Sequence, residues 1–290
     1  YVGVGSEQNF TYIAALKPDI AFIVDIRRGN LDLHLMYKAL FEMSADRADF
    51  VSRLFSRKRP AGLTTTSTAA EIFAAYALAA PSQALYDQNL KAINAHLVST
   101  HGFGLSKGDL SGVEYVFDAM FTQGPDIRYQ LTTGGGGGFG RGGGGGRAVG
   151  GTTYAYLMTA TDDSGKNWSY LANEENFRFL KDLETRNMVI PVVGNFGGTK
   201  ALRAVGMYLK QKNEVVSAFY VSNVEQYLRQ DNIWGNFCMN VQTMPIDQTT
   251  TFIRSERGGF ARQPQRAFAP GFSSELHQVS SDIAVCSTGR

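Results

Sequence analysis

The chain has 290 residues, which suits one large domain or two small ones. Its hydrophobic fraction of 43% can fill a sizeable core, and its net charge of +2, from 28 basic and 26 acidic residues, excludes a globally basic nucleic-acid-binding protein. Its apolar runs are shorter than the ~18 residues that a membrane-spanning helix requires, so no membrane span is expected.

The N-terminal part of the chain reads as strand, helix, strand. A strand is predicted over residues 1–5, a short helix over 9–16, and a second strand over 20–26, where the sequence IAFIVDI is apolar except for Asp25. A run that is apolar on both faces is typical of the interior of a parallel sheet covered by helices. The chain begins inside a predicted strand, without Met or a signal peptide, so the natural N-terminus and any targeting segment are expected to be missing.

A long helical segment follows, and it is expected to be an insertion or cap at 31–131. Its first helix, over 31–43, carries apolar residues at helical spacing, and Asn30 is a suitable N-cap for it. Residues 46–56 and 69–98 continue in helical style. The segment Gly134–Gly151 contains 13 of the 32 glycines, so it cannot pack a core and is expected to be a flexible loop.

The remainder of the chain alternates strands with helices. Strands are predicted over 154–159, 188–194 and 215–221, and a turn over 162–165; helices are predicted over 173–186, 199–212 and 223–229, and an antiparallel pair over 237–243 and 251–254. The tail at 255–290 is expected to be loosely held. This alternation predicts βαβ units, and hence a single α/β domain over 1–290: three-layer and Rossmann-like, with a mostly parallel sheet.

The strongest candidate site lies between the first strand and the first helix. Gly3 and Gly5 leave room for a ligand near the backbone. Asp25 lies near the end of the next strand, 20 residues after Gly5, and an acidic residue at that sequence spacing can bind ribose hydroxyls. A dinucleotide fingerprint requires a third glycine where Gln8 stands, and Glu7 would repel a pyrophosphate. S-adenosylmethionine carries a sulfonium and an ammonium instead, so Glu7 is compatible with that cofactor and is assigned to its site. The structural alternative is a tight turn with Asp25 paired to Arg27 or Arg28.

The chain also resembles known proteins at these positions. The stretches VGVGSEQNFTYIA, AFIVDIRRGN, PVVGNFGG and YVSNVEQYL are similar to an uncharacterised bacterial family grouped with class I (Rossmann-like) methyltransferases. The resemblance covers residues 1–60 and 152–256. The sequence departs from the fuller methyltransferase pattern, because it lacks the usual acid just before the glycine loop and a third glycine in it. It implies that Gly3 and Gly5 hold the methionine part of S-adenosylmethionine and that Asp25 holds its ribose.

Two further loops follow predicted strands and are expected to face the same ligand, because ligands bind beyond the carboxyl ends of strands in open α/β sheets. Asn195 lies in the first loop, in a glycine turn, and is assigned to the cofactor site. In the second, Ser222 and Glu225 have the spacing of a capping box. The remaining polar residues of that segment are assigned to the substrate: Asn223, Gln226 and Tyr227.

Other polar residues are expected to be structural. Glu174 and Glu175 suit the first turn of a helix, and the basic run from Arg53 to Arg59 suits a solvated face rather than a nucleic-acid contact. The four histidines are scattered and form no HExxH motif, so no metal is expected. Two distant cysteines form no disulfide framework, which favours a reducing, cytoplasmic compartment.

These patterns favour a methyltransferase-like protein that binds S-adenosylmethionine and transfers its methyl group to an acceptor that the sequence does not identify. The sequence does not identify a catalytic base. A non-catalytic ligand-binding or interaction protein on the same fold is the alternative, and an NAD-dependent oxidoreductase is a third possibility. The partner expected in each case is a small molecule.

Overall fold

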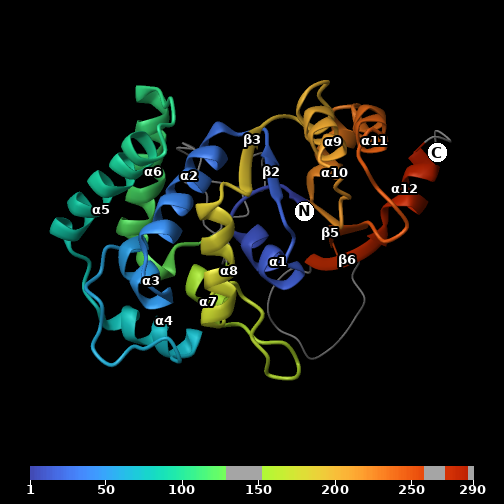
Figure 1. Ribbon diagram of the computed structural model, residues 1–290. Helices are drawn as coiled ribbons and strands as arrows, with labels where there is room; N and C mark the ends of the chain where they lie inside the picture. Colours follow the sequence, from blue (N-terminus) through green and yellow to red (C-terminus); the bar gives the residue numbers. More distant parts are fainter. Residues whose placement is uncertain (129–151, 258–271, 287–290) are drawn as a thin grey trace. The chain divides into compact units, whose positions relative to one another are not determined.

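The computed structural model describes residues 1–128, 152–257 and 272–286. The chain divides into two compact units (Figure 1). We call Tyr1–Gly5, Ile20–Arg27 and Ile190–Arg290 the sheet unit, and Ser6–Asp19 with Arg28–Val189 the helical unit. The helical unit therefore interrupts the sheet unit twice in sequence, and it is larger than the insertion expected at 31–131. The glycine-rich segment Gly134–Gly151 lies outside the described residues.

A six-stranded, mostly parallel sheet organises the sheet unit, and the expected α/β class is confirmed. The strand order is β3-β2-β1-β4-β5-β6. β1 pairs in parallel with β2 and β4, β4 pairs in parallel with β5, and β5 pairs antiparallel with β6. The strands span Val2–Gly3 (β1), Ala21–Asp25 (β2), Val189–Val193 (β3), Ala218–Ser222 (β4), Thr251–Arg257 (β5) and Phe272–Gln278 (β6).

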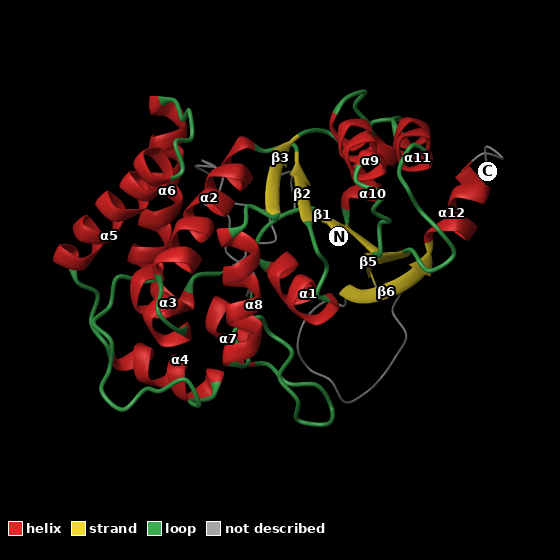
Figure 2. Ribbon diagram, viewed as in Figure 1, coloured by secondary structure: helices red, strands yellow, loops and turns green. Residues whose placement is uncertain are grey.

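Aromatic side chains form much of the core of the sheet unit. Phe219 on β4 meets Phe237 at 6.1 Å and Phe252 on β5 at 5.6 Å between ring centroids. Phe196 stacks on Phe237 at 5.8 Å. Phe237 lies on α11 (Trp234–Gln242), so these rings pack that helix against the sheet. The other helices that follow strands of this unit are α9 (Ala201–Gln211), α10 (Val224–Gln230) and α12 (Val279–Cys286) (Figure 2).

The helical unit has its own aromatic core. Phe10 lies edge-on to Tyr37, Phe41 and Tyr170, with centroids 5.2–5.4 Å apart. Its helices are α1 (Gln8–Leu16), α2 (Arg28–Met43), α3 (Arg47–Leu54), α4 (Ala69–Leu78), α5 (Gln83–Ala95), α6 (Lys107–Gln123), α7 (Tyr154–Thr159) and α8 (Glu174–Thr185), with a π-helix η1 (His96–Thr100) and a 3₁₀ turn η2 (Gly124–Asp126). No helix among the described residues is long and apolar enough to cross a membrane.

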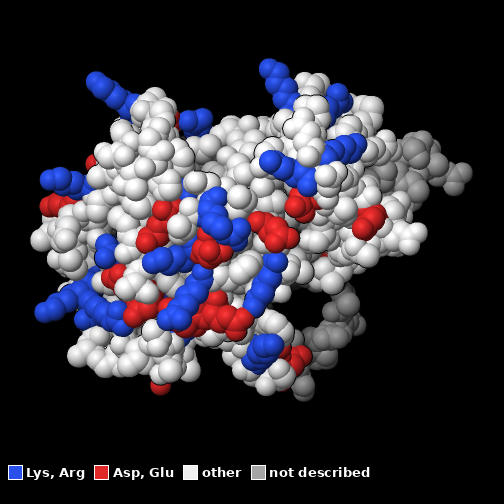
Figure 3. All heavy atoms as spheres, viewed as in Figure 1, with Lys and Arg blue, Asp and Glu red and all other residues white. Residues whose placement is uncertain are grey.

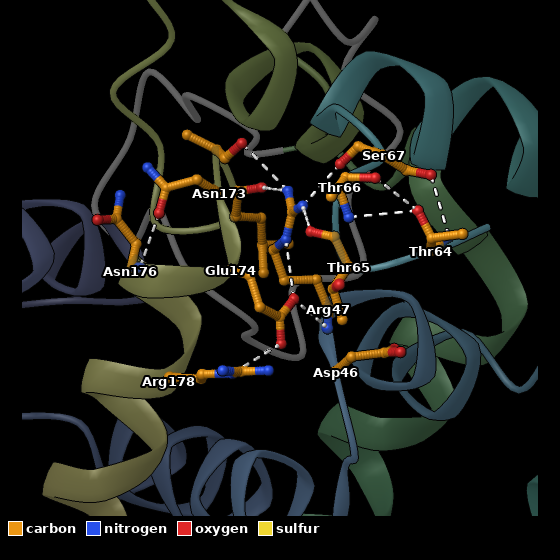
Figure 4. A network of polar contacts seen from close by, with 12 residues as sticks. Asp46, Arg47, Thr64, Thr65, Thr66, Ser67, Asn173, Glu174, Asn176 and Arg178 are labelled. Atoms are coloured by element: carbon orange, nitrogen blue, oxygen red, sulfur yellow. Dashed lines mark hydrogen bonds and ion pairs between the residues drawn. The ribbon is translucent and has the colours of Figure 1, made fainter.

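A buried arginine ties three segments of the helical unit together (Figure 4). Arg47, at the start of α3, pairs through Nε with Glu174 Oε2 at 3.2 Å. Its remaining nitrogens donate to the carbonyls of Leu171 and Ala172 before α8, and of Thr65 and Ser67 in the loop before α4. A buried guanidinium requires such a full set of acceptors, so Glu174 has a structural partner beyond the helix dipole.

Several sequence expectations are wrong in detail. Residues 154–159 form helix α7 instead of a strand: the Thr153 side chain caps it, and Tyr154 and Met158 are buried while Tyr156 is 64% exposed. Over so short a segment, a buried pair four residues apart suits a helix as well as a strand. Residues 237–243 lie mainly in helix α11, so they are no partner for β5.

The expected loosely held tail contributes structure where it is described. β5 continues to Arg257, and β6 and α12 follow. The segments 258–271 and 287–290 lie outside the described residues. Asn30 is not an N-cap, because α2 already begins at Arg28.

The close contact between α2 and α6 gives a test of the helical unit. A Cβ on Gly112 of α6 would lie 2.2 Å from Oδ2 of the buried Asp32, whereas a Cβ on Gly108 would meet nothing closer than 3.5 Å. We expect Gly112→Ala to lower the free energy of unfolding by about 1–3 kcal/mol through overpacking. The matched Gly108→Ala should change it by at most about 1 kcal/mol, towards stabilisation. Urea denaturation measures both; equal effects of the two substitutions would contradict this packing.

Candidate functional site

The turn after β1 has the backbone geometry that a glycine provides. Gly5 has φ = +85°, in the left-handed region that other residues adopt only at a cost, and a Cβ there would have nothing within 4 Å. Gly3, which ends β1, is buried. β1 lies between β2 and β4, so this turn leaves the sheet at its centre.

Asp25, at the end of β2, is held by Arg27. Oδ1 accepts hydrogen bonds from the Arg27 backbone N–H at 2.8 Å and from Nε at 3.1 Å, and Oδ2 accepts from Nη2 at 3.0 Å. The Asp25 side chain is 5% exposed and that of Arg27 is 42% exposed. The hydrogen bond to this carboxylate raises the pKa of Arg27. The pairing foreseen as the structural alternative therefore exists, and it fixes the carboxylate at the edge of the sheet.

The loop after β3 lies beside Asp25. The N–H of Gly194 donates to the carbonyl of Asp25 at 2.9 Å, so the ends of β3 and β2 meet. Asn195 Oδ1 accepts from the Gly197 N–H at 2.8 Å and stiffens the turn that follows. An open pocket of about 370 Å³ lies here, lined by residues 192–195, 198–201 and 204. Asn195 therefore contributes to the pocket while its side-chain oxygen has a role in the turn.

A residue that the sequence analysis missed supports this loop. Asn240 on α11 is 1% exposed, and its Nδ2 donates to the carbonyls of Phe196 and Gly198 at 2.7 Å each. Its Oδ1 accepts from Arg203 Nε at 2.7 Å. The sequence analysis predicted a strand at 237–243, so it did not identify Asn240 as a partner of this loop. Asn240 makes these contacts from helix α11.

The segment after β4 differs from its expected local structure. Ser222 has φ = +51°, and Asn223, which precedes α10, makes no side-chain capping bond. Glu225 instead forms a bidentate ion pair with Arg254 of β5: Oε2 accepts from Nε at 2.8 Å and Oε1 accepts from Nη2 at 2.9 Å. The predicted capping box is wrong, because a charge-assisted pair with a largely buried arginine is the stronger interaction for that carboxylate. Gln226 and Tyr227 are exposed and Asn223 is partly exposed, so all three are accessible on or beside α10.

These loops share one edge of the sheet. β1, β2 and β4 are parallel neighbours, so their carboxyl ends point the same way, and Gly194 joins the end of β3 to them. Gly3, Gly5, Asp25, Asn195 and Asn223 accordingly follow adjacent strand ends.

Glu7 follows the glycine turn in sequence. It belongs to the helical unit, is 2% exposed, and precedes α1. Burial raises its pKa to about 7, although the hydroxyls of Ser6 and Tyr37 offset part of the rise. Tyr154 and Tyr170, hydrogen-bonded to each other, are also near, and among the described residues Oε2 of Glu7 makes no hydrogen bond. A carboxyl with a pKa of about 7 is only partly ionised at neutral pH and offers less charge to a sulfonium or ammonium, so we leave Glu7 out of the proposed site.

Surface charge and cysteine chemistry bear on the remaining expectations. On the face seen in Figure 3, basic and acidic side chains are interspersed rather than gathered into a single basic patch. Arg57 and Arg59 of the basic run are engaged structurally: Arg57 donates to the carbonyls of Tyr76 and Ala79, and Arg59 pairs with Asp46. Cys238 is disulfide-bonded, so the expectation that the cysteines form no disulfide framework does not hold for it. A cytoplasmic location remains a prediction.

The chain matches a family described as a domain of unknown function (DUF7790), over residues 1–100 and 152–282. Because the match covers most of its length, the chain belongs to this family. The matched segments flank residues 101–151, which include the glycine-rich stretch. No curated protein matches the chain.

The buried Glu7 predicts a pH-dependent stability. Its pKa is about 7 in the folded protein against 4.5 ordinarily, so between these values the folded state retains a proton that the unfolded chain has released. The free energy of unfolding should therefore fall as pH rises through this window, by up to about 1.4 kcal/mol per pH unit. Glu7→Gln should remove that contribution, and urea denaturation across the range measures it.

The comparison with the parent isolates Glu7. Burial also raises the pKa of Glu184, to about 8, but Glu184 is present in both proteins and cancels in the difference. We expect Glu7→Gln and the parent to be similarly stable near pH 4 and the variant to be more stable near pH 8. A difference that stays constant with pH would contradict the buried, protonated state of Glu7.

Proposed function

We propose that this member of the DUF7790 family binds S-adenosylmethionine at the carboxyl edge of its sheet and acts as a methyltransferase-like enzyme. The observation that supports the proposal is the strand order, which follows the 3-2-1-4-5-6 order of Rossmann folds, with β6 antiparallel to β5. In such a sheet, ligands bind where the order reverses, which is at β1. The turn with Gly3 and Gly5 leaves β1 at that point, and Asp25 ends the neighbouring strand.

Asp25 is proposed to accept a hydrogen bond from a ribose hydroxyl. A carboxylate offers about four lone-pair positions, and Arg27 uses three of them, so one remains on Oδ2. The ion pair thus positions the carboxylate without filling its hydrogen-bonding capacity. A fixed acceptor binds its ligand with less loss of side-chain freedom than a mobile one.

The neighbouring loops extend the proposed site. The open pocket after β3 adjoins Asp25 and offers Asn195 and Thr199 as polar groups. Asn223, Gln226 and Tyr227 follow β4 on the other side of β1, and we assign them to the methyl acceptor. Methyl transfer depends mainly on aligning the acceptor with the methyl group, so no catalytic base is named.

A second ligand class and a non-catalytic role remain as outcomes of the test. Burial of Glu7 removes one argument against a dinucleotide, and Gln8 in place of the third glycine is the argument that remains. NAD is therefore the comparison ligand in every titration. A protein that binds S-adenosylmethionine without transferring its methyl group would correspond to the non-catalytic alternative.

Calorimetric titration of the 290-residue chain tests the proposal. We expect Asp25→Asn to weaken S-adenosylmethionine binding by about 1.5–3 kcal/mol, the value of a charge-assisted hydrogen bond. Arg27→Gln breaks the same ion pair but keeps the carboxylate, so it should retain binding better than Asp25→Asn. Asp231→Asn, at an exposed position after α10, controls for loss of charge and should bind as the parent does.

The outcomes are distinct. Equal losses in Asp25→Asn and Arg27→Gln would mean that the ion pair matters only for folding, and the ribose role of Asp25 would fail. If the parent binds NAD and not S-adenosylmethionine, the proposed cofactor is wrong. Melting temperatures of all three variants, measured alongside, identify any loss that comes from unfolding.

A further inference from the structure

Two histidines and a glutamate of the helical unit converge on one point. Glu42 lies in the last turn of α2, His96 begins η1, and His101 follows it. Nε2 of His96 and Nε2 of His101 each lie 2.7 Å from the same atom, Oε2 of Glu42. The three ligand atoms all lie within 4.8 Å of one another. These are two of the four histidines that the sequence analysis treated as scattered.

The π-helix is what brings the two imidazoles together. The N–H of His101 donates to the carbonyl of His96 at 3.1 Å, which is the i→i+5 bond of a π turn. In an α-helix of 3.6 residues per turn, residues five apart point in directions about 140° apart. The wider π turn reduces that angle, so both rings face α2. π turns of this kind occur frequently at functional sites.

Neighbouring groups fix the orientation of the three side chains. The Lys38 ammonium lies 2.6 Å from Oε1 of Glu42, one turn earlier on α2, which leaves Oε2 to the histidines. Phe103 stacks on His101 with ring centroids 5.0 Å apart. Metal sites commonly have such outer partners, which hold the ligands in place.

We propose that Glu42, His96 and His101 bind a divalent transition-metal ion of the Zn²⁺ class. Two imidazole nitrogens and one carboxylate oxygen are the donor set of three-ligand zinc sites, in which a fourth position is open to water or substrate. The His96 and His101 side chains are 18% and 13% exposed, so solvent reaches the cluster. Zn²⁺ with bonds of about 2.0–2.1 Å separates its ligand atoms by about 3.3 Å. Each nitrogen therefore needs to move away from Oε2 by roughly half an ångström, which side-chain rotation provides.

The cluster is independent of the proposed cofactor site. All three ligands belong to the helical unit, whereas Gly3, Gly5 and Asp25 belong to the sheet unit. A metal at this position therefore needs no S-adenosylmethionine, and its test stands whatever the cofactor titration finds.

Titration of the metal-depleted 290-residue chain with Zn²⁺, in competition with a chromophoric chelator, tests the proposal. We expect one ion per chain. His96→Gln and His101→Gln should each weaken binding by more than about 100-fold, because even outer partners of a metal site are worth 10–100-fold. His277→Gln, in the sheet unit, should bind as the parent does. Unchanged affinity in His96→Gln and His101→Gln, or no saturable binding to the parent, would overturn the site.

A second measurement uses only the parent chain, in case the histidine variants fail to fold. Addition of Zn²⁺ should shift the imidazole proton resonances of His96 and His101 and leave those of His34 and His277 unchanged. Shifts at other histidines, or at none, would mean that the three side chains form a hydrogen-bonded cluster without a metal.

Discussion

The placement of β1 between β2 and β4 is the constraint on which the sheet unit depends. This strand has only two residues, yet both are buried and Val2 pairs with Phe22 on one side and Phe219 on the other. Strands that are distant in sequence are joined through it. Both segments that leave the sheet unit for the helical unit begin next to it, after Gly5 and after Arg27. Gly3, Gly5 and Asp25 therefore lie within two residues of the points at which the chain leaves the sheet unit.

Paired charges fix the strand ends around this centre. Asp25 is held by Arg27 beyond β2, and Glu225 beyond β4 is held by Arg254, which also pairs with Asp282 of α12. Asn240 holds the loop beyond β3 through two backbone carbonyls. The loops after β2, β3 and β4 each have such a polar partner from the sheet unit. Loops held in this way retain one geometry before a ligand arrives, which lowers the entropic cost of binding.

The sequence predicts the regular elements well where the pattern is long or the local signal is strong. The buried run of β2 and the cap of α8 by Asn173 are both as expected. Helices α7 and α11 were missed because a short segment with alternating apolar residues fits either structure. The surroundings of Glu7 depend on Tyr37, Tyr154 and Tyr170, which are distant in sequence, so no local pattern reveals its burial. The convergence of His96 and His101 requires a π turn, for which the sequence offers no signal.

The most direct measurement of the central claim is a pair of crystal structures of the chain, grown with and without S-adenosylmethionine. We expect difference density at the end of β1, between the turn at Gly3 and Gly5 and the free lone pair of Asp25 Oδ2, with the Asp25–Arg27 pair retained. Density bound elsewhere on the molecule, or bound ligand that leaves Gly3, Gly5 and Asp25 untouched, would contradict it.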